Sequence, residues 1–144
     1  MEAVLFIMGG LIYTWIEVLW RGWTHWSMFL LGGLGFVTMG LLNEYRFDWN
    51  KSLILQSMTS AIIITILEFF TGCIINLWFK WNVWDYSTLP YNLLGQICFQ
   101  YFLLWIPLSF IGIIFDDWIR YGLYRLFSRV LPNMKRREKP HYNL

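Results

Sequence analysis

The sequence predicts an all-α polytopic membrane protein: a compact up-and-down bundle of about four transmembrane helices plus an inner interfacial amphipathic helix. Of its 144 residues, 58% are hydrophobic and only 14% are charged, which is far more apolar than an ordinary globular domain. The apolar residues form four blocks, each near the ~20 residues needed to cross ~30 Å of hydrocarbon. Short connections separate the blocks, so successive helices should be antiparallel neighbours.

The first two spans are expected over residues 3–20 and 27–43. Glu2 is acidic and no small-residue cleavage pattern follows it, so we interpret the first span as a retained helix and not as a removable signal peptide. The second span is rich in glycine, which predicts close packing against another helix. These glycines are Gly32, Gly33, Gly35 and Gly40.

The third span, 52–79, is longer than the hydrocarbon core, which predicts tilt or an extension beyond it. The fourth, 93–115, contains Pro107 and should be kinked there. Residues 118–131 place apolar side chains at helical spacing between arginines, which indicates a helix lying in the inner interface; a straight continuation of the fourth span is the alternative. Residues 132–144 form a basic cytoplasmic tail.

Lysine and arginine are unevenly distributed between the segments that flank the spans. The C-terminal segment and the connection after the second span are rich in them, and the other two connections carry one each, so both termini of this multi-pass protein should face the cytoplasm from the cell membrane. The rich segments hold Arg120, Arg125, Arg129, Lys135, Arg136, Arg137 and Lys139, and Arg46 and Lys51; the poor ones hold Arg21 and Lys80.

Tryptophans cluster near the predicted span boundaries, where their amphipathic rings favour the membrane interface. Most of them are therefore expected to be interface anchors and not ligand-stacking residues. They are Trp20, Trp23, Trp26, Trp49, Trp78, Trp81, Trp84 and Trp118.

Polar groups within the spans are expensive and therefore informative. At 1.5 Å rise per residue, two glutamates and two glutamines from three spans come out within roughly 5 to 15 Å of the outer boundary. This convergence predicts a polar cluster in the outer half of the bundle, closed by loop residues. The candidate substrate-binding residues are Glu17, Arg21, Glu68, Asn76, Asp85, Tyr86, Gln96 and Gln100.

A carboxylate at that depth could bind a cation or exchange a proton, which indicates a permease-like or channel-like protein for a small polar or cationic solute. Alternatively, Glu17 with Arg21, or Glu68 with an amide, forms a buried pair that fixes helix register. The rival functions are a non-transporting interaction or regulatory subunit and a holin-like oligomeric pore former.

An enzyme would have to use His25, Asp85 and Glu17 as acid, base and orienter. No nucleophile-elbow, zinc or phosphate-loop spacing accompanies these residues, so we expect no catalytic residue, no metal site and no cofactor. The lipid bilayer is an expected partner and nucleic acid is not.

Several segments resemble a known family. "YTWIEVLW" followed by "RG", then "TILEFFTGCIINLWFKWNVWDYS" and "NLLGQICF", are similar to the integral membrane family called ABC-transporter type IV, or CmpB-like. The resemblance covers roughly residues 10–105, and the pairing of W-D-Y-S with G-x-I-C is its most specific part. The matching positions are Glu17, Arg21, Gly22, Glu68, Trp84, Asp85, Tyr86, Ser87, Gly95, Gln96 and Cys98.

The resemblance implies a permease. Because the chain has no Walker A pattern, any ATPase would be a separate subunit. Four helices are few for a permease, so a homo-oligomer or a partner membrane subunit is also implied. This sequence departs from the family after the RG turn, where "THWSMFLLGGLG" lacks the prolines of many members, and Gln96 stands where arginine is commoner.

Overall fold

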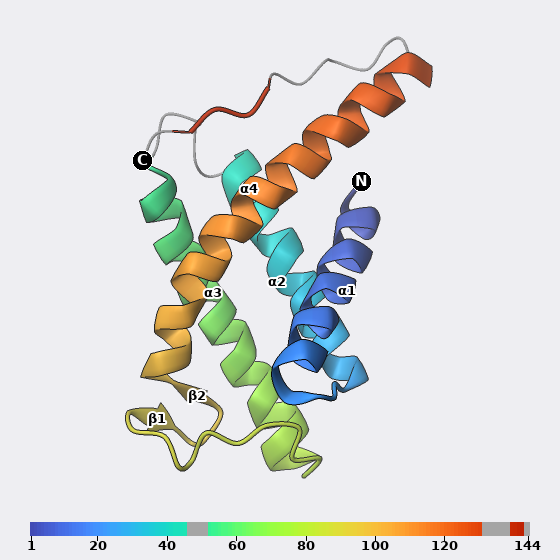
Figure 1. The fold of residues 1–144 in the computed structure, drawn as a ribbon. Helices are drawn as coiled ribbons and strands as arrows, with labels where there is room; N and C mark the ends of the chain where they lie inside the picture. Colours follow the sequence, from blue (N-terminus) through green and yellow to red (C-terminus); the bar gives the residue numbers. More distant parts are fainter. Residues whose placement is uncertain (46–51, 131–138, 143–144) are drawn as a thin grey trace.

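The computed structural model describes residues 1–45, 52–130 and 139–142, and most of this part of the chain is helical (Figure 1). The predicted all-α bundle is confirmed. The elements are α1 (Glu2–Arg21), α2 (Trp26–Tyr45), α3 (Leu53–Gly72) continued by the π-helix η1 (Cys73–Trp78), the two-residue strands β1 (Asn92–Leu93) and β2 (Ile97–Cys98), and α4 (Phe99–Val130).

Within the described residues, three helical segments are long and apolar enough to cross a membrane. They are Glu2–Arg21, Leu53–Trp78 and Phe99–Ser128. The described apolar stretch of α2, Trp26–Leu42, is shorter. The long third span is thus one continuous helical segment that ends in a π-helix. Arg46, Trp49 and Lys51, and the tail residues Lys135, Arg136 and Arg137, lie outside the described residues.

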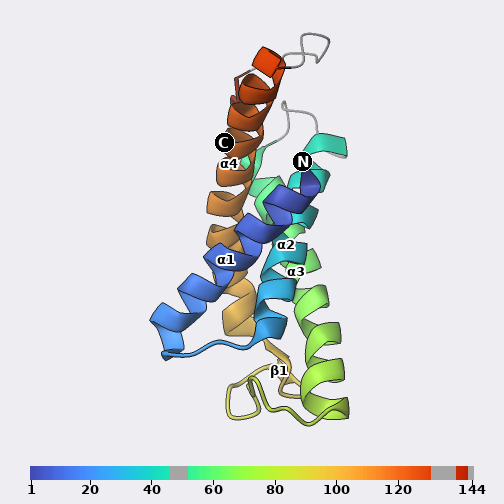
Figure 2. The ribbon, with the colours of Figure 1, turned by 90° about the vertical axis from the view of Figure 1, so that its right-hand side faces the viewer.

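The helices pack as two antiparallel pairs, α1 with α2 and α3 with α4, and α2 also contacts the second pair. Figure 2 shows the turn after α1 and the β1–β2 segment at one end of the bundle, which we call the hairpin end. Met1 lies at the opposite, terminal end. Tyr142 also lies there, because its hydroxyl donates to Asp117 of α4 over 3.1 Å. The two ends of the described chain are therefore on the same side of the bundle.

Glycines let α1 and α2 approach closely, as the sequence predicts for the second span. A Cβ built on Gly32 would lie 2.3 Å from Cβ of Tyr13, and one on Gly9 would lie 2.3 Å from Cβ of Phe36. Aromatic side chains of each helix thus fill the space that the glycines of the other leave open. Gly22 has a different role: its φ of 80° ends α1 in a left-handed turn, with its N–H bonded to Val18 O.

The start of the last helix differs from the prediction. α4 begins at Phe99, not at residue 93, because the preceding residues form a β1–β2 hairpin with Asn92 opposite Cys98. Asn92 organises this turn by donating to Leu89 O over 2.7 Å and accepting the N–H of Gly95 over 3.0 Å. Such amide-to-backbone bonds compete with helix formation.

α4 then runs without a break to Val130, with Pro107 inside it. Residues 118–130 are therefore the straight continuation of the fourth span, which was the alternative to a separate interfacial helix. The apolar spacing that suggested such a helix belongs to a segment that packs on the terminal end, since Ile119 contacts the core around Leu5 and Ile113.

Candidate functional site

The carboxylate of Glu68 lies on α3 near the hairpin end and is only 2% exposed. The hydroxyl of Tyr86 donates to its Oε1 over 3.1 Å, and the indole N–H of Trp105 donates to its Oε2 over 3.0 Å. None of the ion pairs found among the described residues includes Glu68. Among the described residues, this buried carboxylate is thus held by two neutral donors and by no cationic side chain.

Tyr86 lies in the loop between η1 and β1, so the residue that covers the Glu68 carboxylate comes from a loop. Its ring stacks on Tyr101 of α4 at 4.5 Å between centroids, with 16° between planes. Burial raises the pKa of the Tyr86 phenol, and the neighbouring Glu68 carboxylate adds to this effect. The phenol therefore stays protonated and can act as a hydrogen-bond donor throughout the physiological pH range.

Glu17 and Arg21 form a second network at the end of α1. Arg21 Nη2 is 2.7 Å from Glu17 Oε1, and the Thr24 hydroxyl donates to the other carboxylate oxygen. Arg21 Nη1 donates to Val83 O over 2.5 Å, and its guanidinium lies 4.1 Å from the Trp23 ring centroid. In this network the charge of Glu17 is matched by a cation, and the pair ties α1 to the loop.

Asn76 and Gln96 form a third network between η1 and the hairpin. Asn76 Nδ2 donates to Gln96 Oε1 over 2.8 Å, and Asn76 Oδ1 accepts the N–H of Val83 over 2.7 Å. Trp84, 7% exposed, donates its indole N–H to Gln96 O over 3.0 Å, so this tryptophan is a buried structural residue and not an interface anchor. Since Arg21 also bonds Val83, the second and third networks meet at that residue.

Asp85 and Gln100 do not join these networks. The Asp85 carboxylate accepts the N–H of Ser87 over 2.8 Å and its hydroxyl over 3.0 Å, which is a local turn cap at the surface. Gln100 is exposed in the first turn of α4, whereas Gln96 is buried in the hairpin. The prediction that Gln96 and Gln100 both belong to the fourth span is therefore wrong for Gln96, because α4 starts after it.

Six of the eight candidate residues thus fall into three neighbouring networks and not into one cluster, and Asp85 and Gln100 join none of them. Among the described residues the Glu68 carboxylate has no cationic partner, which sets it apart from Glu17. Sequence reasoning missed Trp105, the second donor to Glu68. The signal that could have found it was depth: Trp105 on the fourth span and Glu68 on the third both lie in the half of the bundle nearest the hairpin end.

A further polar group, also missed, lies at the terminal end. Arg120 is 3% exposed; its Nε is 2.7 Å from Asp116 Oδ2, and its Nη1 is 2.7 Å from Glu2 Oε1. Positive-inside counting had used Arg120 as an interface cation, whereas it joins α4 to the start of α1. The sequence signal was the spacing of Asp116 and Arg120, four residues apart in an apolar helix.

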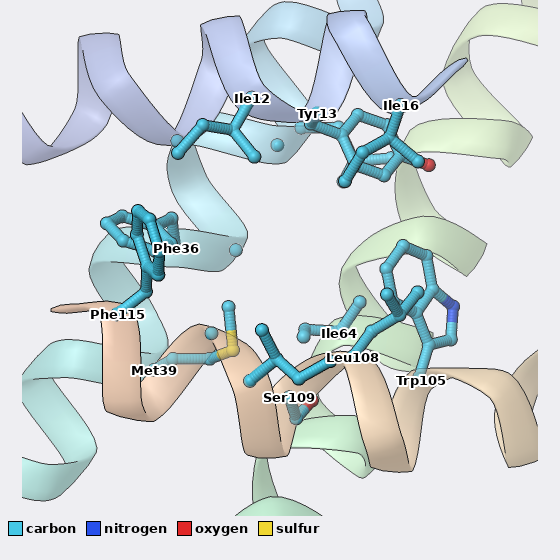
Figure 3. Close-up of a pocket in the computed structure, with 16 residues that line it drawn as sticks. Ile12, Tyr13, Ile16, Phe36, Met39, Ile64, Trp105, Leu108, Ser109 and Phe115 are labelled. Atoms are coloured by element: carbon cyan, nitrogen blue, oxygen red, sulfur yellow. The ribbon is translucent and has the colours of Figure 1, made fainter. Parts of the chain in front are cut away.

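An apolar cavity of about 250 Å³ lies between α1 and α4, and α2 and α3 also contribute to its lining (Figure 3). Its lining is hydrophobic except for the Tyr13 and Ser109 hydroxyls. Trp105 and Tyr13 stack at one end, with centroids 5.8 Å apart. The lining includes Gly9, Ile12, Tyr13, Ile16, Gly35, Phe36, Met39, Ile64, Trp105, Leu108, Ser109, Ile111, Gly112 and Phe115.

Comparison with known proteins agrees with the family that the sequence resembles. The family model described as "Putative ABC-transporter type IV" matches residues 4–135. No curated protein and no solved structure was found to match the chain. Because the family match covers well over half of the sequence, the chain belongs to this ABC-transporter type IV family of membrane proteins.

Proposed function

We propose that the chain is a permease-like membrane protein that binds and passes a small polar or cationic solute at Glu68, in the half of the bundle nearest the hairpin end. The observation that carries the proposal is the buried carboxylate with two neutral donors and no cationic partner among the described residues. Ionisable groups inside membrane spans are rare and generally mark a pathway. Glu17, matched by Arg21, has instead the features of a structural pair.

The surroundings of Glu68 suit a bound cation or proton. Each carboxylate oxygen has further acceptor capacity after one hydrogen bond. A buried charge without an opposite charge is costly, so a cation that reaches the carboxylate gains a strong attraction. Tyr86 and Trp105 fix the orientation of the carboxylate and thereby of anything that binds to it.

Membership of an ABC-transporter family supports a role in transport together with other subunits. The chain has four helices and no Walker A pattern, so we include in the proposal a second copy or a partner subunit and an ATPase encoded separately. The proposed setting is the cell membrane, with both termini in the cytoplasm.

Uptake into proteoliposomes tests the proposal. Purified full-length protein is reconstituted, and uptake of ammonium, guanidinium, choline and potassium is measured for wild type, Glu68→Gln and Glu2→Gln. Glu2→Gln is a matched control because Glu2 lies at the terminal end, bonded to Arg120. We expect Glu68→Gln to abolish uptake of at least one cation that wild type and Glu2→Gln take up.

Unfolding in detergent is compared in parallel, so that loss of the fold is distinguished from loss of the site. Equal uptake by a folded Glu68→Gln variant would overturn the proposal. A leak of every solute that survives Glu68→Gln would favour a holin-like pore, and co-purification of a partner without any uptake would favour an interaction subunit.

A further inference from the structure

The cavity between α1 and α4 has an apolar rim as well as an apolar lining. Ile16 on α1, and Ile111 and Phe115 on α4, line it and are also exposed at the surface. All three lie in segments long and apolar enough to span a membrane. The open side of the cavity therefore lies between two membrane-spanning helices, where an apolar or amphiphilic molecule dissolved in the lipid can reach it.

The size and lining of the cavity favour an apolar occupant. Apolar cavities of about 150 Å³ in protein cores stay dry and take up benzene. This cavity is larger, at about 250 Å³, and holds room for a benzene-sized group with substituents. Gly35 adds to this room, because a Cβ built on it would meet only Ile64 Cγ1, at 3.8 Å.

Trp105 belongs both to the cavity and to the carboxylate site. Its ring lines one end of the cavity, and its Nε1 donates to Glu68 Oε2 over 3.0 Å. Figure 3 shows the ring nitrogen on the side away from Met39 and Phe115. Ile64, which also lines the cavity, lies one helical turn before Glu68 on α3. The carboxyl group of Glu68 therefore lies directly behind the aromatic end of the cavity.

An aromatic end backed by a carboxylate favours a positive charge. The faces of tryptophan and tyrosine attract organic cations, and quaternary ammonium groups are recognised by such rings. Tyr13 and Trp105 stack with only 25° between their planes and both line the same end of the cavity, which we call the aromatic wall. At low dielectric the attraction of a carboxylate extends across a ring thickness.

We propose that the cavity and Glu68 together bind a lipophilic organic cation that enters sideways between α1 and α4. The apolar body occupies the cavity beside Gly35, and the cationic centre lies against Tyr13 and Trp105, in the field of Glu68. This inference rests on the proposed function and narrows its ligand to an amphiphilic cation. A lipid chain alone would fill the cavity but would have no cationic centre to interact with Glu68.

Binding of benzyltrimethylammonium to full-length protein in nanodiscs tests this inference. Wild type is expected to bind it saturably, and about tenfold or more tightly than tetramethylammonium, which has the charge but little apolar body. Neopentylbenzene, the uncharged carbon isostere, should not compete at equal concentration. Tryptophan fluorescence provides a readout at the aromatic wall, and equilibrium dialysis provides the affinity.

Two variants separate the cavity from the charge. Gly35→Leu fills the cavity and should weaken benzyltrimethylammonium about tenfold or more while leaving tetramethylammonium binding within about twofold. Gly122→Leu is its matched control, since nothing lies within 4 Å of a Cβ at Gly122 and it does not line the cavity. Glu68→Gln should weaken both cations.

The outcomes distinguish this inference from the proposed function. If wild type fails to bind benzyltrimethylammonium while Glu68-dependent uptake of a small cation persists, the inference fails and the proposed function stands. Effective competition by neopentylbenzene, or full binding by Glu68→Gln, would show that only apolar contact matters and would overturn the inference. Equal binding of benzyltrimethylammonium by Gly35→Leu and Gly122→Leu would show that the cavity does not hold the ligand and would overturn the inference.

Discussion

Arg120 carries a full charge at a nearly inaccessible position, and its partners explain how the fold tolerates it. Asp116 lies one turn earlier on α4, and Glu2 comes from the start of α1, with both Nη atoms of the arginine within 2.9 Å of its carboxylate oxygens. A two-pronged contact of this kind uses the planar geometry of the guanidinium. The group therefore fixes α1 against α4 at the terminal end, on one side of the cavity.

Replacing Arg120 should be strongly destabilising. Arg120→Ala leaves Asp116 buried without this cation, and breaking a buried pair in this way typically costs about 3–5 kcal/mol. Arg125→Ala is the control, because Arg125 is exposed on the same helix and should change stability by no more than about 0.5 kcal/mol. Free energies of unfolding from detergent-denaturant titration measure both; similar values would show that the buried pair contributes little.

At this scale the sequence predicted the burial of Glu68 but not the exposed position of Gln100. Depth along a helix depends only on residue spacing, so a glutamate well inside an apolar span is expected to be buried whatever its neighbours are. Gln100 depends on where α4 starts, which is decided by the Asn92 and Gly95 hydrogen bonds of the hairpin. Such local turn chemistry changes a helix start without changing the apolar pattern.

The contact between α1 and α2 is the clearest case of sequence determining how two elements pack. Gly32 lies against Tyr13 and Gly33 against Phe6, so glycines and aromatic rings alternate across the contact. Without a hydrophobic driving force between helices in lipid, this close packing is a main source of their association. Gly35, on the same helix, faces the cavity and has no such neighbour.

Alanine substitutions at Gly32 and at Gly35 should therefore have different effects on stability. Gly32→Ala places a methyl group 2.3 Å from Tyr13 Cβ and should destabilise the protein by about 1–3 kcal/mol through overpacking. Gly35→Ala fits without a clash and should be neutral or stabilising by up to about 1 kcal/mol, because alanine favours a helix over glycine. Thermal unfolding in one detergent gives the comparison, and equal shifts would contradict the packing described.

The sequence pattern alone did not predict how α4 continues through Pro107 and over residues 118–130. Proline is expected to disturb a helix, yet α4 passes through it, which membrane helices tolerate where neighbours compensate. Apolar residues at helical spacing fit an interfacial helix and a packed continuation equally well. The packing of Ile119 against the core cluster that contains Leu5 and Ile113 decides between the two, and that packing is tertiary.

Over the whole molecule, hydropathy predicted the architecture because lipid restricts spanning structures to helices of nearly fixed length. The cavity could not be predicted in this way, since it depends on the distance that packing leaves between α1 and α4. The same holds for the separate networks of Glu68 and Glu17. Sequence depth placed both carboxylates at one level, and the spacing of Glu17 and Arg21 allowed them to pair, but neither showed that Tyr86 and Trp105 would reach Glu68.

The hairpin end and the terminal end of the bundle each carry an exposed residue that can be labelled to test the membrane orientation. Thr88 is exposed at the hairpin end and Lys139 is exposed in the segment that ends near Asp117. In a background with Cys73→Ser and Cys98→Ser, which removes the two free thiols, a cysteine replaces either residue. A membrane-impermeant maleimide should label Thr88→Cys in intact cells, and Lys139→Cys only after permeabilisation, if both termini are cytoplasmic. The reverse pattern would invert the proposed orientation.

The π-helix at the end of the third span makes the chain length there critical. The N–H of Phe79, directly after η1, bonds Ile74 O over 3.0 Å, which closes a wide turn. η1 therefore has more residues per turn than an α-helix. Asn76 lies within it and reaches both Val83 and Gln96. Deleting one residue between Cys73 and Trp78 is expected to restore α-helical winding and to rotate Asn76 away from the hairpin. The segment can thus accept substitutions on its lipid side far more readily than a change in length.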